Sequence, residues 1–271
     1  MNPERIAEAI DQAHQQGDLL RTGTFPELES GAAAMDAASA LHDIRIHAGL
    51  HAVGWKLGYT SEAMRRQMNI AQPNAARIYS EWIAADSKVA RRLMHPRIEP
   101  EVCITMGESI RWSSLRPLSS DQQVHFVSNR IAAAHCALEI VDSVWRDYHF
   151  TWGENTADGS SAAGAVIGDE IPSLSDLGEL TVGLSLDRST TDGHTAEASP
   201  RVEGHSRDVM GNPLNAVVWL IRYLDSKGIV LSPGEIVLTG GITASIDFPL
   251  ESVAHASFAS KNWGGGVVAI R

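Results

Sequence analysis

Apolar residues near the start of the chain recur every three or four positions, which is the period of an amphipathic helix. They lie between Asn2-Pro3 and Gly17. Asparagine caps helix starts, proline fits the first helical position, and glycine commonly ends a helix. The pattern predicts one helix between these residues and a second, alanine-rich helix from Ala33 to Ala48.

Beyond these helices the apolar runs become short and are bounded by glycine, which is typical of strands. Two further helical patterns interrupt them, one from Asp121 to His135 and one that begins at Asn212-Pro213 and ends at Gly228. The expected strands are Ala52 to Gly58, Arg97 to Gly107, Ala163 to Gly168, Leu180 to Leu186, Glu235 to Gly240 and Gly266 to Arg271.

Many strands with few intervening helices do not fit a doubly wound parallel sheet. We therefore predict an α+β fold, in which a helical N-terminal portion (residues 1–50) packs on a large mixed β-sheet, barrel-like core (residues 51–271). No internal repeat or linker divides the sequence, so we expect a single domain.

The charge balance excludes one class of function. The chain has 33 acidic and 22 basic residues, a net charge of −11, whereas binding to nucleic acid requires a clustered basic surface. We see no signal peptide and no apolar stretch that would span a membrane. Cys103 and Cys136 lie in apolar segments, which favours buried thiols over a disulfide. We expect a soluble, cytoplasmic protein that binds neither nucleic acid nor membrane.

Two acidic residues close together give the first candidate for chemistry. In a strand, Glu99 and Glu101 point to the same face because side chains alternate. Two carboxylates so close repel each other unless a cation lies between them, and oxygen ligands suit Mg²⁺ or Mn²⁺. The alternative is a solvated edge strand, which Pro100 would permit.

Glu139 is a third candidate, because it lies in the apolar run Ala137 to Val141, after the helix expected to end at His135. A charged residue in such a run needs a partner. That partner is either a metal ion shared with the first two carboxylates or an arginine such as Arg97 or Arg130.

Several motifs in one order resemble the hydratases and decarboxylases of bacterial meta-cleavage pathways, within the fumarylacetoacetate hydrolase superfamily. This family is typified by 2-hydroxypenta-2,4-dienoate (2-oxopent-4-enoate) hydratase and 4-oxalocrotonate decarboxylase. The resemblance runs nearly from end to end of the chain. The matching segments are Gly54 to Ser61, Pro96 to Glu101, Ala137 to Ser143, Asn155 to Ser161, Gly211 to Val217 and Gly234 to Gly240.

The resemblance implies a fold like the C-terminal domain of fumarylacetoacetate hydrolase and assigns roles to five residues. It makes Glu99, Glu101 and Glu139 the ligands of Mg²⁺ or Mn²⁺, Lys56 the active-site lysine and Ser161 a serine of the substrate pocket. Without the resemblance, Lys56 is better explained as a surface lysine of an edge strand, and Ser161 is equally well explained as a turn residue.

Further residues are implied to bind substrate, and some depart from the family pattern. The loop containing Gly240, Gly241 and Ile242 resembles the one whose backbone approaches the substrate carboxylate. Asn74 stands where the family commonly has an aspartate, and an amide cannot do the acid–base work of a carboxylate. Arg77 either binds a second substrate carboxylate or forms a surface salt bridge.

The implied activity is metal-dependent addition of water to a 2-hydroxy-2,4-dienoate, through its 2-oxo tautomer, to give a 4-hydroxy-2-oxo acid. The alternatives are decarboxylation of 4-oxalocrotonate-type 2-oxo dicarboxylates, tautomerisation alone, or a catalytically silent partner subunit. The resemblance also implies a homo-oligomer, with a paired hydratase or decarboxylase as a further partner.

Overall fold

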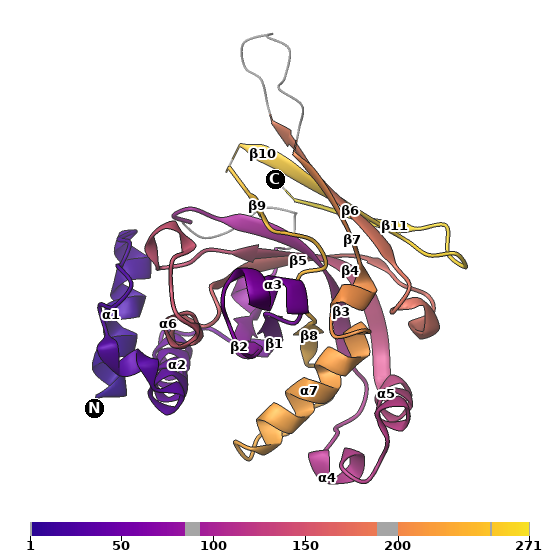
Figure 1. Cartoon of the computed structure of the whole chain (residues 1–271), viewed down its shortest axis with the longest axis horizontal. Helices are drawn as coiled ribbons and strands as arrows, with labels where there is room; N and C mark the ends of the chain where they lie inside the picture. Colours follow the sequence, from indigo (N-terminus) through magenta and orange to yellow (C-terminus); the bar gives the residue numbers. More distant parts are fainter. Residues whose placement is uncertain (1, 85–92, 189–199, 250, 271) are drawn as a thin grey trace.

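Two β-sheets flanked by helices form the molecule, in a computed structural model that describes residues 2–84, 93–188, 200–249 and 251–270 (Figure 1). The helices are α1 (Pro3–Gln16), α2 (Gly31–His47), α3 (Glu62–Gln67), α4 (Trp112–Leu115), α5 (Ser120–Ser128), α6 (Trp152–Ala157) and α7 (Pro213–Asp225). The strands are β1 (Ala52–Gly58), β2 (Asn74–Tyr79), β3 (Arg97–Met106), β4 (Ile131–Val141), β5 (Ala162–Glu170), β6 (Thr181–Arg188), β7 (Arg201–His205), β8 (Ile236–Leu238), β9 (Ile246–Asp247), β10 (Ser252–Ala259) and β11 (Gly266–Ile270).

The larger sheet is mixed and has the order β2-β1-β8-β3-β4-β5, with β9 also paired to β3. Only β1 and β8 are parallel neighbours among the described pairs. The smaller sheet, β11-β10-β6-β7, is antiparallel. Neither sheet closes on itself in the described part of the chain, so the α+β prediction is confirmed but the barrel-like core is wrong: the core is two open sheets.

The two sheets share one apolar core, which includes Leu138 and Val166 from the larger sheet and Leu184 and Phe258 from the smaller. Gly168 permits close approach at the edge, because a Cβ there would lie 2.5 Å from the Cβ of Val268 in β11. This packing fixes the position of β3 and β4 in the middle of the larger sheet, where the candidate carboxylates lie.

The N-terminal helices form a second, smaller core beside the sheets, at the left of Figure 1. As predicted, the Asn2 side chain caps α1 by accepting a hydrogen bond from the amide of Arg5, and Gly17 ends the helix in the left-handed conformation (φ 76°). Ile6 and Ile10 of α1 pack with Trp145, which is completely buried. The helical segment therefore rests on the chain that follows β4.

The helix expected from Asp121 to His135 is wrong in its second half. Only Ser120–Ser128 is helical, and the chain turns at Asn129 and Arg130 before entering β4. His135 and Cys136 therefore belong to a strand. The two cysteines are buried free thiols, as expected.

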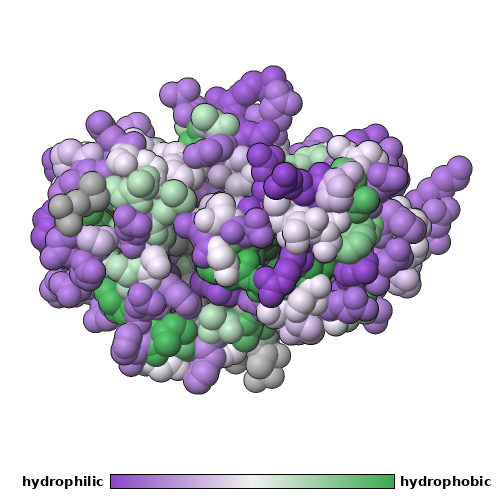
Figure 2. Space-filling view, turned by 90° about the horizontal axis from the view of Figure 1, so that it is seen from below, coloured by the Kyte–Doolittle hydropathy of each residue, from purple (hydrophilic) through white to green (hydrophobic). Residues whose placement is uncertain are grey.

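Hydrophilic residues cover most of the face shown in Figure 2, where the hydrophobic residues form small separate patches. Among the described residues, no helix combines the length and apolarity that crossing a bilayer requires.

Candidate active site

Glu99, Glu101 and Glu139 come together on one face of the β3–β4 pair. Glu99 lies directly opposite Glu139 in the antiparallel register, and Glu101 is two residues further along β3. Each residue offers a carboxylate oxygen within 4.8 Å of the others. The structure therefore brings together three carboxylates from two strands, as the sequence predicted.

These carboxylates fit a divalent cation. Glu101 and Glu139 are almost completely buried, and neither Glu101 Oε1 nor Glu139 Oε2 has a hydrogen-bond partner among the described residues. Buried carboxylate oxygens without partners are costly, and a hard cation with oxygen ligands removes that cost. The donor set and its orphaned oxygens therefore suit a metal ion of the Mg²⁺ or Mn²⁺ type.

Burial and mutual repulsion shift the pKa values of the three carboxyl groups. Burial and the charge of Glu139 raise the pKa of Glu99 to about 7, against the opposing effect of Lys56. Burial and the charge of Glu139 raise the pKa of Glu101 well above its usual value, and burial raises that of Glu139. Without a cation the site therefore retains protons, which a metal ion would displace.

Lys56, on β1, is the nearest cation to this group. Its side chain is buried, and Nζ lies 3.2 Å from Glu139 Oε1 and donates to the backbone oxygen of Ser160 at 2.9 Å. Burial alone lowers the pKa of Lys56, but the charges of Glu139, Glu101 and Glu99 outweigh burial and raise it. Lys56 is therefore a charged, buried donor beside the carboxylates, and the surface position suggested by the bare sequence is excluded.

The loop after β8 closes the site from the opposite side. The amide of Gly240 donates to Glu101 Oε2 at 2.7 Å. A Cβ on Gly241 would lie 2.2 Å from Glu99 Oε2, so only glycine leaves room for that carboxylate. Gly241 lines the cavity described next, whereas Ile242 belongs to the apolar core.

A cavity of about 170 Å³ is lined by Lys56, Glu99, Ser161 and Arg97, among other residues. Three of its lining residues, Tyr59, Ser160 and Ser161, have left-handed backbone conformations with φ between 55° and 58°. Each such residue other than glycine costs about 1 kcal/mol or more, and such strain gathers at functional sites. The backbone around this cavity is therefore held in place by its surroundings.

Arg97 provides a second cation in the lining of the cavity, and no sequence motif gave it a role in substrate binding. It precedes Glu99 by two residues on β3, its guanidinium lies 4.1 Å from the centre of the Tyr148 ring, and its Nε lies 3.1 Å from the Asp247 carboxylate. The same alternation that pairs Glu99 with Glu101 also puts residue 97 on this face, so the signal was present in the sequence.

Asn74 is buried in a polar network behind Lys56. Its Oδ1 accepts from Ser160 Oγ at 2.9 Å, and its Nδ2 donates to Asn155 Oδ1 at 2.9 Å. Asn155 in turn donates to Ser161 Oγ at 2.9 Å. Asn74 thus positions the serines that line the cavity, and its amide adds no titratable group.

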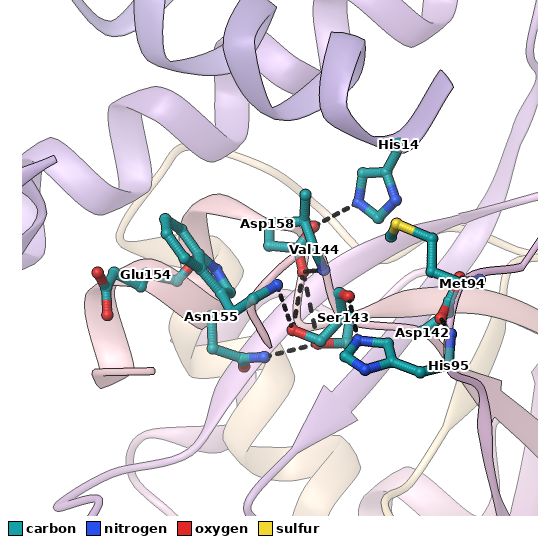
Figure 3. Close-up of polar contacts among 11 residues, drawn as sticks. His14, Met94, His95, Asp142, Ser143, Val144, Glu154, Asn155 and Asp158 are labelled. Carbon is teal, nitrogen blue, oxygen red and sulfur yellow. Dashed lines mark hydrogen bonds and ion pairs between the residues drawn. The ribbon is translucent and has the colours of Figure 1, made fainter. Parts of the chain in front are cut away.

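A buried aspartate supports this network from the side of α1 (Figure 3). Asp158 Oδ1 lies 2.6 Å from His14 Nε2, while Oδ2 accepts from the Val144 amide at 3.1 Å and lies 3.5 Å from Ser161 Oγ. A second aspartate, Asp142, accepts hydrogen bonds from the backbone amides of Met94 and His95, which fixes the chain that enters β3. These buried carboxylates thus hold the walls of the cavity.

Arg77 is placed away from the cavity. It pairs in register with Trp55, so its side chain shares the face of β1–β2 opposite to that of Lys56. Its guanidinium lies 3.8 Å from the Trp55 ring centre and 2.8 Å from Glu235. Cys103, which alternates onto the face of Glu101, is a buried member of a small apolar cluster.

Comparison with known proteins agrees with this fold. No protein-family model matches the sequence. The structure superposes on 4-oxalocrotonate decarboxylase from Pseudomonas putida G7, complexed with magnesium and adipate, with a TM-score of 0.83 and 24% identity over 99% of this chain and 96% of that one. A putative fumarylacetoacetate hydrolase family protein from Yersinia pestis CO92 matches with a TM-score of 0.52 and 14% identity over 80% and 91% of the two chains. The chain therefore shares its fold with these two proteins.

Sequence comparison finds similarity to two kinds of enzyme. The chain is 29% identical to a 4-oxalocrotonate decarboxylase from a Pseudomonas species, over 91% of this chain and 90% of the relative. It is also 29% identical to the 2-keto-4-pentenoate hydratase of Paraburkholderia xenovorans (strain LB400), over 88% and 84% of the two chains. The chain is a homologue of the 2-keto-4-pentenoate hydratases and 4-oxalocrotonate decarboxylases, as the sequence motifs predicted.

Proposed function

We propose that this protein is a metal-dependent hydro-lyase that adds water to a 2-hydroxy-2,4-dienoate, through its 2-oxo tautomer, to give a 4-hydroxy-2-oxo acid in aromatic meta-cleavage catabolism. The observation that carries the proposal is the juxtaposition of three carboxylates with the buried ammonium of Lys56, beside a cavity that Lys56 and Glu99 line. The homology to 2-keto-4-pentenoate hydratases supports the choice of substrate class.

The metal site consists of Glu99, Glu101 and Glu139 and takes Mg²⁺ or Mn²⁺. Bound there, the cation supplies Lewis-acid stabilisation of the negative charge that develops on the 2-oxygen of the substrate. The two sequence relatives do not distinguish between these metals, while the magnesium complex of the similar decarboxylase supports Mg²⁺.

The remaining roles belong to residues that line the cavity. Lys56, charged and fixed by Ser160, donates a hydrogen bond or a proton where substrate charge develops. Ser161, held by Asn155, orients the substrate. Arg97 attracts a second anionic group of the substrate, in place of Arg77, whose position on the opposite face removes it from this role.

A second candidate is decarboxylation of a 4-oxalocrotonate-type 2-oxo dicarboxylate, and Asn74 favours it. Hydration requires a group that gives or takes a proton at the far carbon, and the amide behind Ser160 offers none. Decarboxylation instead needs stabilisation of the enolate left when CO₂ departs, which a metal and Lys56 provide. Arg97 would then bind the second carboxylate.

One assay separates these activities. The ultraviolet absorbance of 2-hydroxypenta-2,4-dienoate is followed with Mg²⁺ and with EDTA, and CO₂ release is measured from 4-oxalocrotonate. We expect metal-dependent loss of the dienoate and formation of 4-hydroxy-2-oxopentanoate, abolished in Lys56→Met and kept in Glu203→Gln, an exposed control. CO₂ release without hydration would establish the second candidate. If the protein catalyses neither reaction, it is a catalytically silent partner subunit.

The assembly is part of the same proposal. We expect a homo-oligomer, alone or paired with a hydratase or decarboxylase of the same pathway. Light scattering on the purified chain measures its mass, and a monomer at micromolar concentration would contradict the homo-oligomer.

A further inference from the structure

A second cavity, of about 120 Å³, lies beside the edge strand β2, between α2 and the end of α7. It shares no lining residue with the cavity that contains Lys56 and Glu99. Arg77 and Trp55 face it from the side of the β1–β2 pair that is opposite to Lys56. The two cavities are therefore separate sites.

The described lining of this cavity carries three cationic side chains and no carboxylate. The cations are Arg45 of α2, Arg77 of β2 and Lys227, which follows α7. In a chain with a net charge of −11, a hollow lined by one sign of charge opposite to that of the whole molecule concentrates anions.

Arg45 is the strongest element of this site. Only 6% of the residue is exposed. Its guanidinium lies 4.9 Å from the Trp82 ring centre and 5.9 Å from that of Tyr79. Across the part of the chain that the structure describes, no carboxylate lies within ion-pair distance of it. A buried charge without a counter-ion is costly, so a bound anion would stabilise it.

Carboxylates outside the lining partly offset this charge, because Glu235 pairs with Arg77, Asp43 lies near His42 and Asp36 lies near Lys227. Glu235 balances Arg77 at 2.8 Å from outside the lining, and Lys227 lies over the Tyr223 ring at 5.1 Å. Burial, and after it the charge of Arg77, lower the pKa of His42 at the cavity wall.

The walls are aromatic as well as cationic. Trp55, Tyr79 and Tyr223 line the cavity, and the buried indole N–H of Trp55 has no acceptor among the described residues. The cavity volume of about 120 Å³ is somewhat below the volume of about 150 Å³ of an apolar cavity that holds one benzene ring, so one ring is the largest apolar group that the space can take. Guanidinium groups pair geometrically with carboxylates.

We propose that this cavity binds a small aromatic carboxylate, with its ring against the aromatic walls and its carboxylate paired with Arg45 beside Lys227. The proposal is independent of the reaction assigned to the carboxylate cavity, because the two sites share no lining residue.

Isothermal titration of the full-length protein with benzoate tests the proposal, with EDTA present so that no metal ion attracts the anion to Glu99, Glu101 and Glu139. We expect one benzoate per chain, with affinity reduced about tenfold or more in Arg45→Gln and in Lys227→Gln. Lys261→Gln, which removes an equal charge outside both cavities, should bind as the parent does. Uncharged benzamide should bind at least about tenfold more weakly.

The variants keep the proposal falsifiable if Arg45→Gln fails to fold, because Lys227 is exposed and its replacement leaves the packing intact. Equal benzoate affinity in Lys227→Gln and Lys261→Gln would overturn the proposal. Equal binding of benzamide and benzoate, or no heat with millimolar benzoate, would also overturn it. If only Lys56→Met lost benzoate binding, benzoate would bind in the cavity that contains Lys56 and Glu99, and the proposal would be overturned.

Discussion

Replacement of Glu99 by glutamine should flatten the dependence of folding stability on pH when no metal is bound. In the folded chain, burial and the charge of Glu139 raise the pKa of Glu99 from 4.5 to about 7. A carboxyl group whose folded pKa is raised stabilises the fold below its unfolded pKa, where it is protonated in both states. That stabilisation is lost as the pH rises through the folded pKa.

The size of the effect follows from the two pKa values. The interval between 4.5 and about 7, at about 1.4 kcal/mol for each pKa unit, amounts to about 3 kcal/mol. Glutamine is neutral throughout and removes this loss. It also removes a charge that raises the pKa of Glu101, so the flattening should be at least this large.

Urea unfolding followed by tryptophan fluorescence, at intervals from pH 4.5 to 8.5 with EDTA, measures the effect. The free energy of unfolding of the parent should fall by about 3 kcal/mol relative to Glu99→Gln across this range. Glu203→Gln, an exposed control, should follow the parent. Saturating Mg²⁺ should remove most of the fall in the parent, because the cation keeps the carboxylates ionised. Parallel pH curves for the parent and Glu99→Gln would refute the assigned burial and repulsion.

Three further changes test the walls of the site. Gly241→Ala places a Cβ 2.2 Å from Glu99 Oε2, so titration calorimetry should show Mg²⁺ affinity reduced about tenfold or more relative to Gly264→Ala, whose added Cβ meets nothing within 4 Å. Arg97→Gln removes a cation from the lining of the cavity, so steady-state kinetics should show KM raised about tenfold with a smaller change in kcat, and an unchanged KM would contradict its role. Asp158→Ala leaves His14 and the Val144 amide without their acceptor, so urea unfolding should show a loss of about 3 kcal/mol, and a loss near zero would mean that solvent replaces it.

Local sequence signals predicted the ends of helices and strands correctly where those ends depend on residues adjacent in the sequence. Asn2, Pro3 and Gly17 mark the ends of α1 as the structure has them, and β1 has the predicted bounds Ala52–Gly58. Caps and glycine boundaries act within one turn or one strand, so no tertiary information is needed.

The failure at β4 has a tertiary cause. The segment Ile131–Val141 has three consecutive alanines after Ile131, which favour a helix locally, but it pairs with β3 on one side and with β5 on the other. The hydrogen bonds and burial of a central strand outweigh a helix propensity of a few tenths of a kcal/mol per residue.

The site was predictable to the extent that it depends on strand alternation. Alternation put Glu99 and Glu101 on one face, and the apolar run made Glu139 a candidate, but the register that sets Glu139 opposite Glu99 comes from the pairing of β3 with β4 and is not a local signal. The same limit explains Arg77, because its face depends on its register with Trp55 of β1.

The register of β3 and β4 also determines which changes in chain length the site can tolerate. Deletion or insertion of one residue between Glu99 and Glu101 turns one of these two carboxylates to the opposite face of the sheet. The segment between the two strands contains α4 and α5 and supplies no carboxylate to the site. Among related sequences, insertions and deletions should therefore occur in the segment equivalent to residues 107–130, while β3 and β4 keep their lengths.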